Sequence, residues 1–194
     1  MRLVIATHNP AKAGEMTVIL GELLTGWEFL TLADFPGASE PDETGETYAE
    51  NARIKAEAAA AFTGEVCIAD DAGLEVDALD GAPGVKSKRF GGVELPFAEK
   101  MALILGSVGE DGGARFRCCV AIALNGEETR VFEAVKEGEI VEPRGARGFG
   151  YDPIFLLPEL GKTYAELEPD HKNRISHRGM VLRQAAEYLS ERWN

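Results

Sequence analysis

The chain has 194 residues, 45% of them apolar, which is enough to fill a sizeable core in one large domain. Its 33 acidic residues outnumber its 20 lysines and arginines, and the net charge of −13 argues against binding to DNA or RNA polymers. The three cysteines lack the Cys-x-x-Cys spacing of redox and zinc sites, and no apolar run is long enough for a signal peptide or a membrane span. These features predict a soluble protein of the cytoplasm with no membrane partner.

The N-terminal stretch predicts a strand, a loop and a helix. Residues 3–6 form a short β-type run, and apolar residues at helical spacing follow the loop. Asn9 is a suitable N-cap and Pro10 a suitable first helical residue, so free N–H groups at the positive helix end would attract an anion. Lys12 is placed to reach a phosphate there, and Thr7 can form hydrogen bonds. The alternative is an ordinarily capped helix.

A strand at 28–32 and an acidic loop at 33–45 precede a second helix. The helix begins with a capping box, Thr47-Tyr-Ala-Glu50, runs through an alanine-rich stretch over 47–62 and is stopped by Gly64. Thr47, Asn51 and Lys55 lie on one face of this helix, at a spacing of four. Such a polar row faces either solvent, which is the usual case, or a binding site.

Two adjacent aspartates end an apolar run and are followed by Gly73, which lets the chain turn there. The run at 66–69 predicts a buried strand that delivers Asp70 and Asp71 to a cleft. Successive strand side chains point to opposite faces, so one aspartate should face the site while the other braces it. Carboxylates at the end of a strand suit Mg²⁺, whose shell substrate phosphates complete. A solvated acidic turn is the alternative.

The rest of the chain predicts further strands and one more long helix. The expected elements are a half-buried strand at 74–78, a helix at 95–105, strands at 115–124 and 129–135 around the hairpin signal Asn125-Gly126, a short strand beginning at Ile140, and a final helix after Ser176. This order predicts an α/β fold with an elongated mixed sheet and flanking helices. We expect residues 1–194 to form a single domain of two lobes with a ligand cleft between them.

The C-terminal half contains two candidate binding segments. A loop at 143–152 places glycines around Phe149 and Tyr151, which suits either stacking on a planar base or packing as a lid over the core. His177 and Arg178 fall in the first turn of the final helix, where cations oppose the helix dipole. Their placement makes sense if an anion or a polar ring binds beside them.

Six blocks in this order carry a resemblance to a known family. They are Thr7-His-Asn-Pro-Ala-Lys12, Glu43-Thr-Gly-Glu-Thr-Tyr-Ala-Glu-Asn51, Ala69-Asp-Asp-Ala-Gly-Leu74, Gly84-Val-Lys-Ser-Lys-Arg-Phe90, Gly148-Phe-Gly-Tyr-Asp-Pro-Ile-Phe155 and Ile175-Ser-His-Arg-Gly179. Together they resemble the inosine/xanthosine triphosphate pyrophosphatase family along the whole chain. The resemblance implies a homodimeric, Mg²⁺-dependent enzyme that hydrolyses dITP, ITP and XTP to the monophosphate and pyrophosphate.

The resemblance also implies a role for each matching residue. Asp71 would be the proton acceptor and a metal ligand, and Glu43 would be the second metal ligand. The triphosphate would be held by Thr7, His8, Asn9, Lys12, Asn51 and Lys55. The base and sugar would be contacted by Phe149, Gly150, Tyr151 and Asp152, and the purine would be read by Lys172, His177 and Arg178.

The sequence departs from the family pattern in two blocks. Ala72 replaces the usual serine after the aspartates, so a ligand contact there must come from the backbone. Lys86-Ser-Lys-Arg-Phe90 replaces the commoner Tyr-Ser-Ala-Arg-Tyr and adds cations. Two alternative functions stay open at this point. One is a pyrophosphatase for another nucleotide such as dTTP or UTP, and the other is a regulator that binds purine nucleotides without hydrolysing them.

Overall fold

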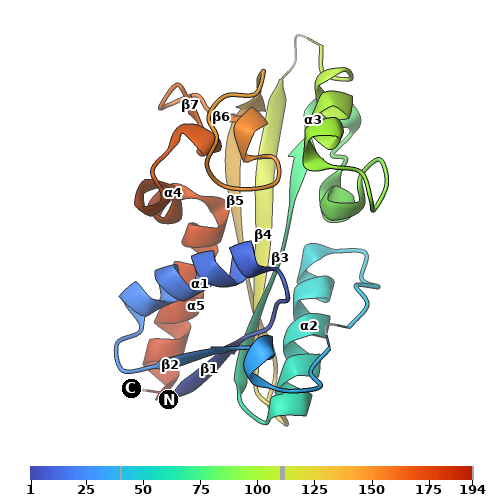
Figure 1. Cartoon of the computed structure of the whole chain (residues 1–194). Coiled ribbons are helices and arrows are strands. Elements are labelled where there is room, and N and C mark those ends of the chain that lie inside the picture. Colours follow the sequence, from blue (N-terminus) through green and yellow to red (C-terminus); the bar gives the residue numbers. More distant parts are fainter. Residues whose placement is uncertain (40, 110–111, 194) are drawn as a thin grey trace. The chain divides into compact units, whose positions relative to one another are not determined.

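The computed structural model describes residues 1–39, 41–109 and 112–193 (Figure 1). The strands are β1 (Arg2–Ile5), β2 (Glu28–Thr31), β3 (Val66–Val76), β4 (Gly113–Ala123), β5 (Arg130–Ile140), β6 (Phe155–Leu157) and β7 (Lys162–Thr163). The α-helices are α1 (Pro10–Leu23), α2 (Tyr48–Thr63), α3 (Phe97–Leu105), α4 (Pro169–Ile175) and α5 (His177–Trp193). Contacts divide the chain into unit 1 (Met1–Asp71, Cys118–Ala134 and Arg178–Asn194) and unit 2 (Ala72–Arg117 and Val135–His177).

The strands of the described residues form one mixed sheet in the order β2-β1-β3-β4-β5-β6-β7. Strand β1 runs parallel to both β2 and β3, because α1 and α2 provide the crossover connections that parallel strands require. Strand β6 runs antiparallel to β5 and β7. The predicted α/β class, with a mixed sheet and flanking helices, is confirmed.

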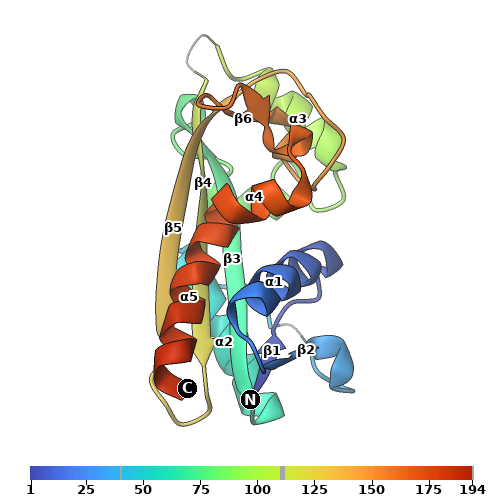
Figure 2. The ribbon, with the colours of Figure 1, turned by 90° about the vertical axis from the view of Figure 1, so that its left-hand side faces the viewer.

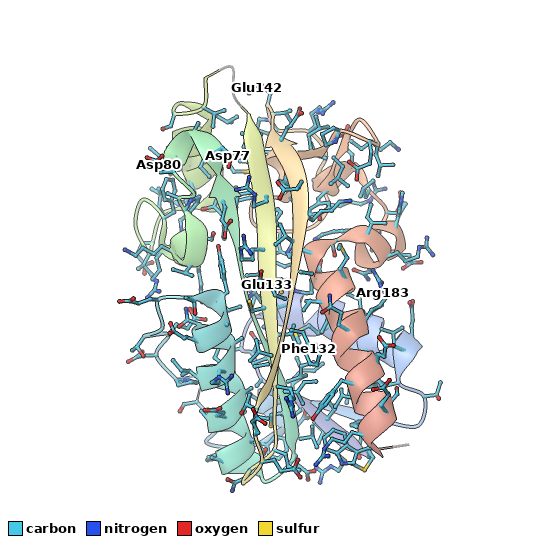
Figure 3. All side chains as sticks on the ribbon, turned by 180° about the vertical axis from the view of Figure 1, so that it is seen from behind. Asp77, Asp80, Phe132, Glu133, Glu142 and Arg183 are labelled. Carbon is cyan, nitrogen blue, oxygen red and sulfur yellow. The ribbon has the colours of Figure 1, made fainter. Side chains whose placement is uncertain are left out.

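Unit 1 is organised around the parallel strands and three helices. Helix α1 buries Met16, Ile19 and Leu20, three of the four apolar residues whose helical spacing predicts it, whereas the fourth, Leu23, is exposed. Helix α1 crosses in front of α5 in Figure 1, and the two helices are adjacent in the view turned by 90° (Figure 2), where Arg178 of α5 donates to Glu15 of α1. From behind, α5 lies beside β5, where Phe132 packs against Tyr188 with ring centroids 5.7 Å apart (Figure 3). Leu182, Ala185, Ala186 and Leu189 of α5 are all buried, in agreement with their helical spacing in the sequence.

Strand β3 corrects one prediction. The chain does not turn at Gly73, and a single extended strand continues from Val66 to Val76 in place of two separate strands. The aspartate doublet therefore lies inside a strand, because pairing in the middle of the sheet overrides the local turn preference of glycine. The register places Ile5, the last residue of β1, opposite Ile68. The two aspartates thus lie just past the carboxyl end of β1.

Unit 2 has its own apolar core. Leu74, Ile104, Phe116, Ile154, Phe155, Leu157 and Tyr164 are among its buried members. Two features of this unit differ from the prediction. Ile140 ends β5 instead of beginning a new strand, and helix α4 forms where no helix was expected. Pro169 at the start of α4 was the sequence signal for that helix. Within the described part of the chain, no helix combines the length and the apolarity needed to cross a membrane.

Candidate functional site

Asn9 caps helix α1, as its sequence predicts, and the loop before this helix contains further hydrogen bonds. The Asn9 side chain accepts hydrogen bonds from the backbone N–H groups of Ala11 and Lys12, at 3.0 and 3.3 Å. The Thr7 hydroxyl accepts from the N–H of Asn9 at 3.1 Å, and the His8 side chain is exposed. These N–H groups are thus already hydrogen-bonded, so the binding of an anion at this end of α1 would depend on the side chain of Lys12.

Asp70 lies at the centre of an ion-pair network that joins three elements of unit 1. Its Oδ2 accepts from Nε and Nη2 of Arg178 on α5, at 3.1 and 2.9 Å, and its Oδ1 lies 3.3 Å from Nζ of Lys12 on α1. Arg178 also donates from Nη1 to Glu15 of α1 at 2.7 Å. Burial alone would raise the pKa of Asp70, but the charges of Lys12 and Arg178 outweigh it and lower the pKa.

Asp71 belongs to a second group of residues, contributed by α2 and the loop before it. Asn51 donates to Asp71 Oδ2 at 3.2 Å, and Nζ of Lys55 lies 3.7 Å from Asp71 Oδ1. The same ammonium donates to Oε1 of Glu43 at 2.6 Å. Asn51 is 0% and Lys55 3% exposed, so these two members of the predicted polar row point into the protein, whereas Thr47 at its start is exposed. We call Glu43, Asn51, Lys55 and Asp71 the α2–β3 cluster.

Burial and charge act differently on the two ionisable partners of this cluster. Burial raises the pKa of Asp71, and the positive charges of Lys55 and Lys12 offset only part of that effect. Burial would lower the pKa of Lys55, but the negative charges of Asp71, Asp70 and Glu43 outweigh it and raise the pKa. Lys55 therefore stays an ammonium ion, and Asp71 is a more basic carboxylate than an exposed aspartate.

Gly45 is a member of this site that the sequence analysis did not single out. Its N–H donates to Oδ1 of Asn51 at 2.8 Å. A Cβ at this position would lie 2.6 Å from the Cβ of Glu50 and 2.7 Å from Oδ1 of Asn51. The acidic loop can therefore approach α2 this closely only because residue 45 has no side chain.

We expect Gly45→Ala to lower the free energy of unfolding by about 1–3 kcal/mol, because the new methyl group must displace Asn51 or the loop. Urea unfolding measures this change. Gly21→Ala is the matched control, since Gly21 lies in α1 with open space around it and alanine should favour the helix by up to about 1 kcal/mol. Equal destabilisation by both variants would contradict the close approach at Gly45.

Unit 2 gathers a separate set of predicted residues around Asp152. Its Oδ2 accepts from Nζ of Lys172 at 2.7 Å and from the backbone N–H of Phe149 at 2.9 Å. The Lys172 ammonium also lies 4.9 Å from the centre of the Phe149 ring, within cation–π range. At Gly148 the backbone has φ +75°, and a Cβ would lie within 2.0 Å of Asp152 Oδ2. This glycine, too, is required by the local geometry.

Of the remaining predicted residues of unit 2, His177 is held by aromatic packing and Tyr151 by a hydrogen bond. The His177 ring stacks on Phe116 with centroids 4.5 Å apart, and Tyr164 lies 5.9 Å away. The hydroxyl of Tyr151 donates to the carbonyl of Ser87 at 2.8 Å, which ties the glycine-aromatic loop to the segment at 84–89. Tyr151 is therefore a buried anchor of this loop, while Gly150 and Ala72 are only half-buried.

The structure thus brings the predicted residues together in three groups. Lys12, Asp70 and Arg178 form one group, the α2–β3 cluster is the second, and Phe149, Asp152 and Lys172 form the third. Glu15 joins the first group without having been predicted, because a glutamate on a helix surface carries no distinguishing signal. Arg178 pairs with Asp70 and Glu15 within unit 1, and the purine contact that the resemblance implies for it stays a prediction.

The α2–β3 cluster has the donor set expected for a magnesium ion. No group of three or more His, Cys, Asp or Glu side chains within the described ranges could hold a metal by itself. Glu43 and Asp71, however, both place a carboxylate oxygen near one cationic atom, Nζ of Lys55. Mg²⁺ typically binds proteins through one or two carboxylates while substrate phosphates complete its shell. Two convergent carboxylates therefore fit this ion.

Known proteins match this chain along nearly its whole length. The chain matches the Ham1 family model over residues 3–188. The dITP/XTP pyrophosphatase of Exiguobacterium sp. is 49% identical over 95% of this chain and 94% of that protein. The dITP/XTP pyrophosphatase of Bacillus subtilis is 44% identical over 96% of each protein. The structure of a HAM1 protein from Coxiella burnetii has a TM-score of 0.88 at 40% identity, covering 98% of this chain and 99% of that one. The resemblance seen in six sequence blocks is thereby confirmed, and the chain belongs to the Ham1 family.

Proposed function

We propose that this chain hydrolyses dITP, ITP and XTP to the nucleoside monophosphate and pyrophosphate, and so removes these nucleotides from the nucleotide pool. The observation that carries the proposal is the near full-length identity of 49% and 44% to two dITP/XTP pyrophosphatases. The buried α2–β3 cluster supplies chemistry that suits such a reaction. That chemistry favours an enzyme over a binding regulator, and the names of the relatives favour purine over dTTP or UTP substrates.

We assign Asp71 as the group that accepts the proton of the attacking water. A general base acts best when its pKa lies closer to the working pH, and burial raises the pKa of this carboxyl. Asn51 donates to the Oδ2 atom, which orients the carboxylate and leaves Oδ1 on the side of Lys55. Asp71 is thus held in one orientation by neighbours on α2.

The lysines and the metal site complete the handling of the phosphates. Lys12 on α1 and Lys55 on α2 would bind phosphate oxygens and offset the negative charge of the departing pyrophosphate. Glu43 and Asp71 would hold Mg²⁺, which when bound supplies further neutralisation of phosphate charge. Asp70 and Arg178 keep Lys12 in place through the ion pairs of 3.3 and 2.9 Å.

The residues of unit 2 would recognise the base. Hypoxanthine and xanthine carry an oxygen at ring position six, and the Lys172 ammonium can donate to it. Adenine would present an amino group to this donor, and sites built on such hydrogen bonds reject the wrong partner by up to about 10⁴–10⁵-fold. Asp152 directs the ammonium, since its carboxylate binds Lys172 at 2.7 Å. His177 is held for base contact by its stacking on Phe116.

Phe149 provides a test of base stacking. We expect Phe149→Ala to raise KM for ITP more than it lowers kcat, because stacking should stabilise the bound substrate and the transition state alike. Loss of stacking on one base typically costs about 1–3 kcal/mol. Steady-state kinetics separate the two parameters. A fall in kcat at unchanged KM would instead assign Phe149 to the chemical step.

We further propose that the protein acts in the cytoplasm as a homodimer. The three cysteines are buried thiols that form no disulfide, which suits a reducing compartment. Analytical ultracentrifugation at assay concentrations tests the dimer, and a monomeric sedimentation coefficient under those conditions would contradict it.

The identity of the products tests which bond is cleaved. Hydrolysis of ITP between the α- and β-phosphates yields IMP and pyrophosphate, whereas cleavage of the terminal phosphate yields IDP and inorganic phosphate. Anion-exchange chromatography of the reaction mixture distinguishes the two pairs. Formation of IMP and pyrophosphate in equal amounts is expected, and accumulation of IDP would contradict the proposed reaction.

A further inference from the structure

Lys55 holds the position where the proposed function requires a metal ion. Its ammonium lies 2.6 Å from Glu43 Oε1 and 3.7 Å from Asp71 Oδ1, and these two carboxylates are the proposed ligands of Mg²⁺. The Lys55 side chain is 3% exposed, so its charge is compensated by these groups and not by water. One cation therefore already lies between the two carboxylates in the free protein.

A second cation cannot simply be added at this place. An ammonium and a divalent ion between the same two carboxylates would repel each other, and the repulsion is poorly screened in a buried site. Lys55 must therefore shift away as the metal arrives. Its new position needs an anion, because a buried ammonium without a partner is unfavourable. The phosphate chain of the substrate is the anion that arrives together with the metal.

We infer that Lys55 is a resident counter-ion that competes with the metal for Glu43 and Asp71 until a phosphate chain takes over its charge. The inference rests on the proposed function in taking these two carboxylates as the metal ligands. Its consequence is a coupling between ligands: the free protein binds a divalent ion weakly, and phosphate strengthens that binding partly by releasing Lys55. By reciprocity, the metal strengthens phosphate binding by the same factor.

The geometry distinguishes Lys55 from the other lysine of unit 1. Lys12 lies 3.3 Å from Asp70 Oδ1, and Asp70 is also bound by Arg178. When the Lys12 charge is removed, Arg178 remains as the counter-ion of Asp70. Lys55 remains paired with Glu43 and Asp71. Lys12→Met is thus a matched control, in which the same charge is lost from the neighbouring network.

Direct metal titration tests the inference without an activity assay. Mn²⁺, which prefers the same oxygen ligands as Mg²⁺, is titrated into nucleotide-free wild-type protein, Lys55→Met and Lys12→Met. Calorimetry and the electron paramagnetic resonance signal of Mn²⁺ measure the binding. We expect the affinity of Lys55→Met for Mn²⁺ to exceed that of wild type by about 5–150-fold, the usual size of coupling between two binding sites. Lys12→Met should change the affinity much less. Inorganic pyrophosphate should strengthen Mn²⁺ binding more in wild type than in Lys55→Met.

The possible outcomes separate this inference from the proposed function. Unchanged or weaker Mn²⁺ binding by Lys55→Met would overturn the inference, whatever the activity of the wild type. Tighter binding that persists when Glu43→Gln is added would place the metal elsewhere and overturn it as well. Loss of ITP hydrolysis by the wild type would instead contradict the function. If Lys55→Met does not fold, Lys55→Gln, which keeps a hydrogen-bond donor for Glu43, takes its place with the same expected result.

Discussion

Replacing Asp71 with asparagine is expected to lower kcat for ITP hydrolysis by about 10²–10⁴-fold, the usual contribution of a general base. The amide keeps an oxygen that can accept from Asn51, which donates to this side chain at 3.2 Å, so the local structure should be preserved. The amide of the new asparagine cannot accept a proton from water at neutral pH. Steady-state kinetics at saturating Mg²⁺ and ITP measure the change, and circular dichroism confirms that the variant is folded.

Asp77→Asn is the control for this substitution. Asp77 lies in unit 2 (Figure 3), where its half-exposed carboxylate forms an ion pair of 2.9 Å with Arg115. The same chemical change there should leave kcat within about twofold, since surface ion pairs contribute little. If Asp71→Asn retained wild-type kcat, another group would have to accept the proton, and the mechanism proposed for the α2–β3 cluster would be wrong.

Asp70→Asn is expected to cause the largest loss of stability, about 3–5 kcal/mol in the free energy of unfolding. The carboxylate is fully buried and lies within 3.3 Å of Lys12 and 2.9 Å of Arg178, so its removal leaves two cations without their shared partner. Chemical denaturation measures the difference. Glu159→Gln, which breaks an exposed ion pair with Lys136, is the control and should cost less than about 1 kcal/mol.

The stability difference between wild type and Asp70→Asn should also depend on pH. The pKa of Asp70 is lower in the folded protein than in the unfolded chain, so the unfolded chain takes up a proton first as the pH falls. The contribution of Asp70 is therefore fully present above the unfolded pKa of about 3.9 and is lost as the pH falls towards the folded pKa. A difference that stayed constant from pH 7 down to pH 3 would show that the charge of Asp70 contributes nothing.

Periodic patterns in the sequence predicted most of the fold, because burial of apolar residues determines where regular elements form. Helix α2 is one example: its capping box, Thr47 with Glu50, and its terminating Gly64 lie where the sequence placed them. The continuous strand β3 was missed because Gly73 signals a turn locally. Only its neighbours in the sheet show that the strand continues.

The candidate site was predictable in its residue types but not in its pairings. The spacing of Asn51 and Lys55 showed that they share a helix face, but it left open whether that face is exposed to solvent or buried. Their burial accompanies tertiary contacts, such as the hydrogen bond from Asn51 to Asp71, which lies 20 residues further along the chain. The link from Arg178 to Asp70 spans more than a hundred residues of sequence, so no local pattern could have revealed it.

A comparison of substrates tests whether the chain is a pyrophosphatase for nonstandard purine triphosphates. Pyrophosphate release is measured from dITP, ITP, XTP, GTP, ATP and dTTP, with Mg²⁺ and with EDTA, and kcat/KM is compared. We expect a strong preference for dITP, ITP and XTP over the other three, with activity abolished by EDTA. Preference for ATP, GTP or dTTP, or hydrolysis that continues in EDTA, would contradict it.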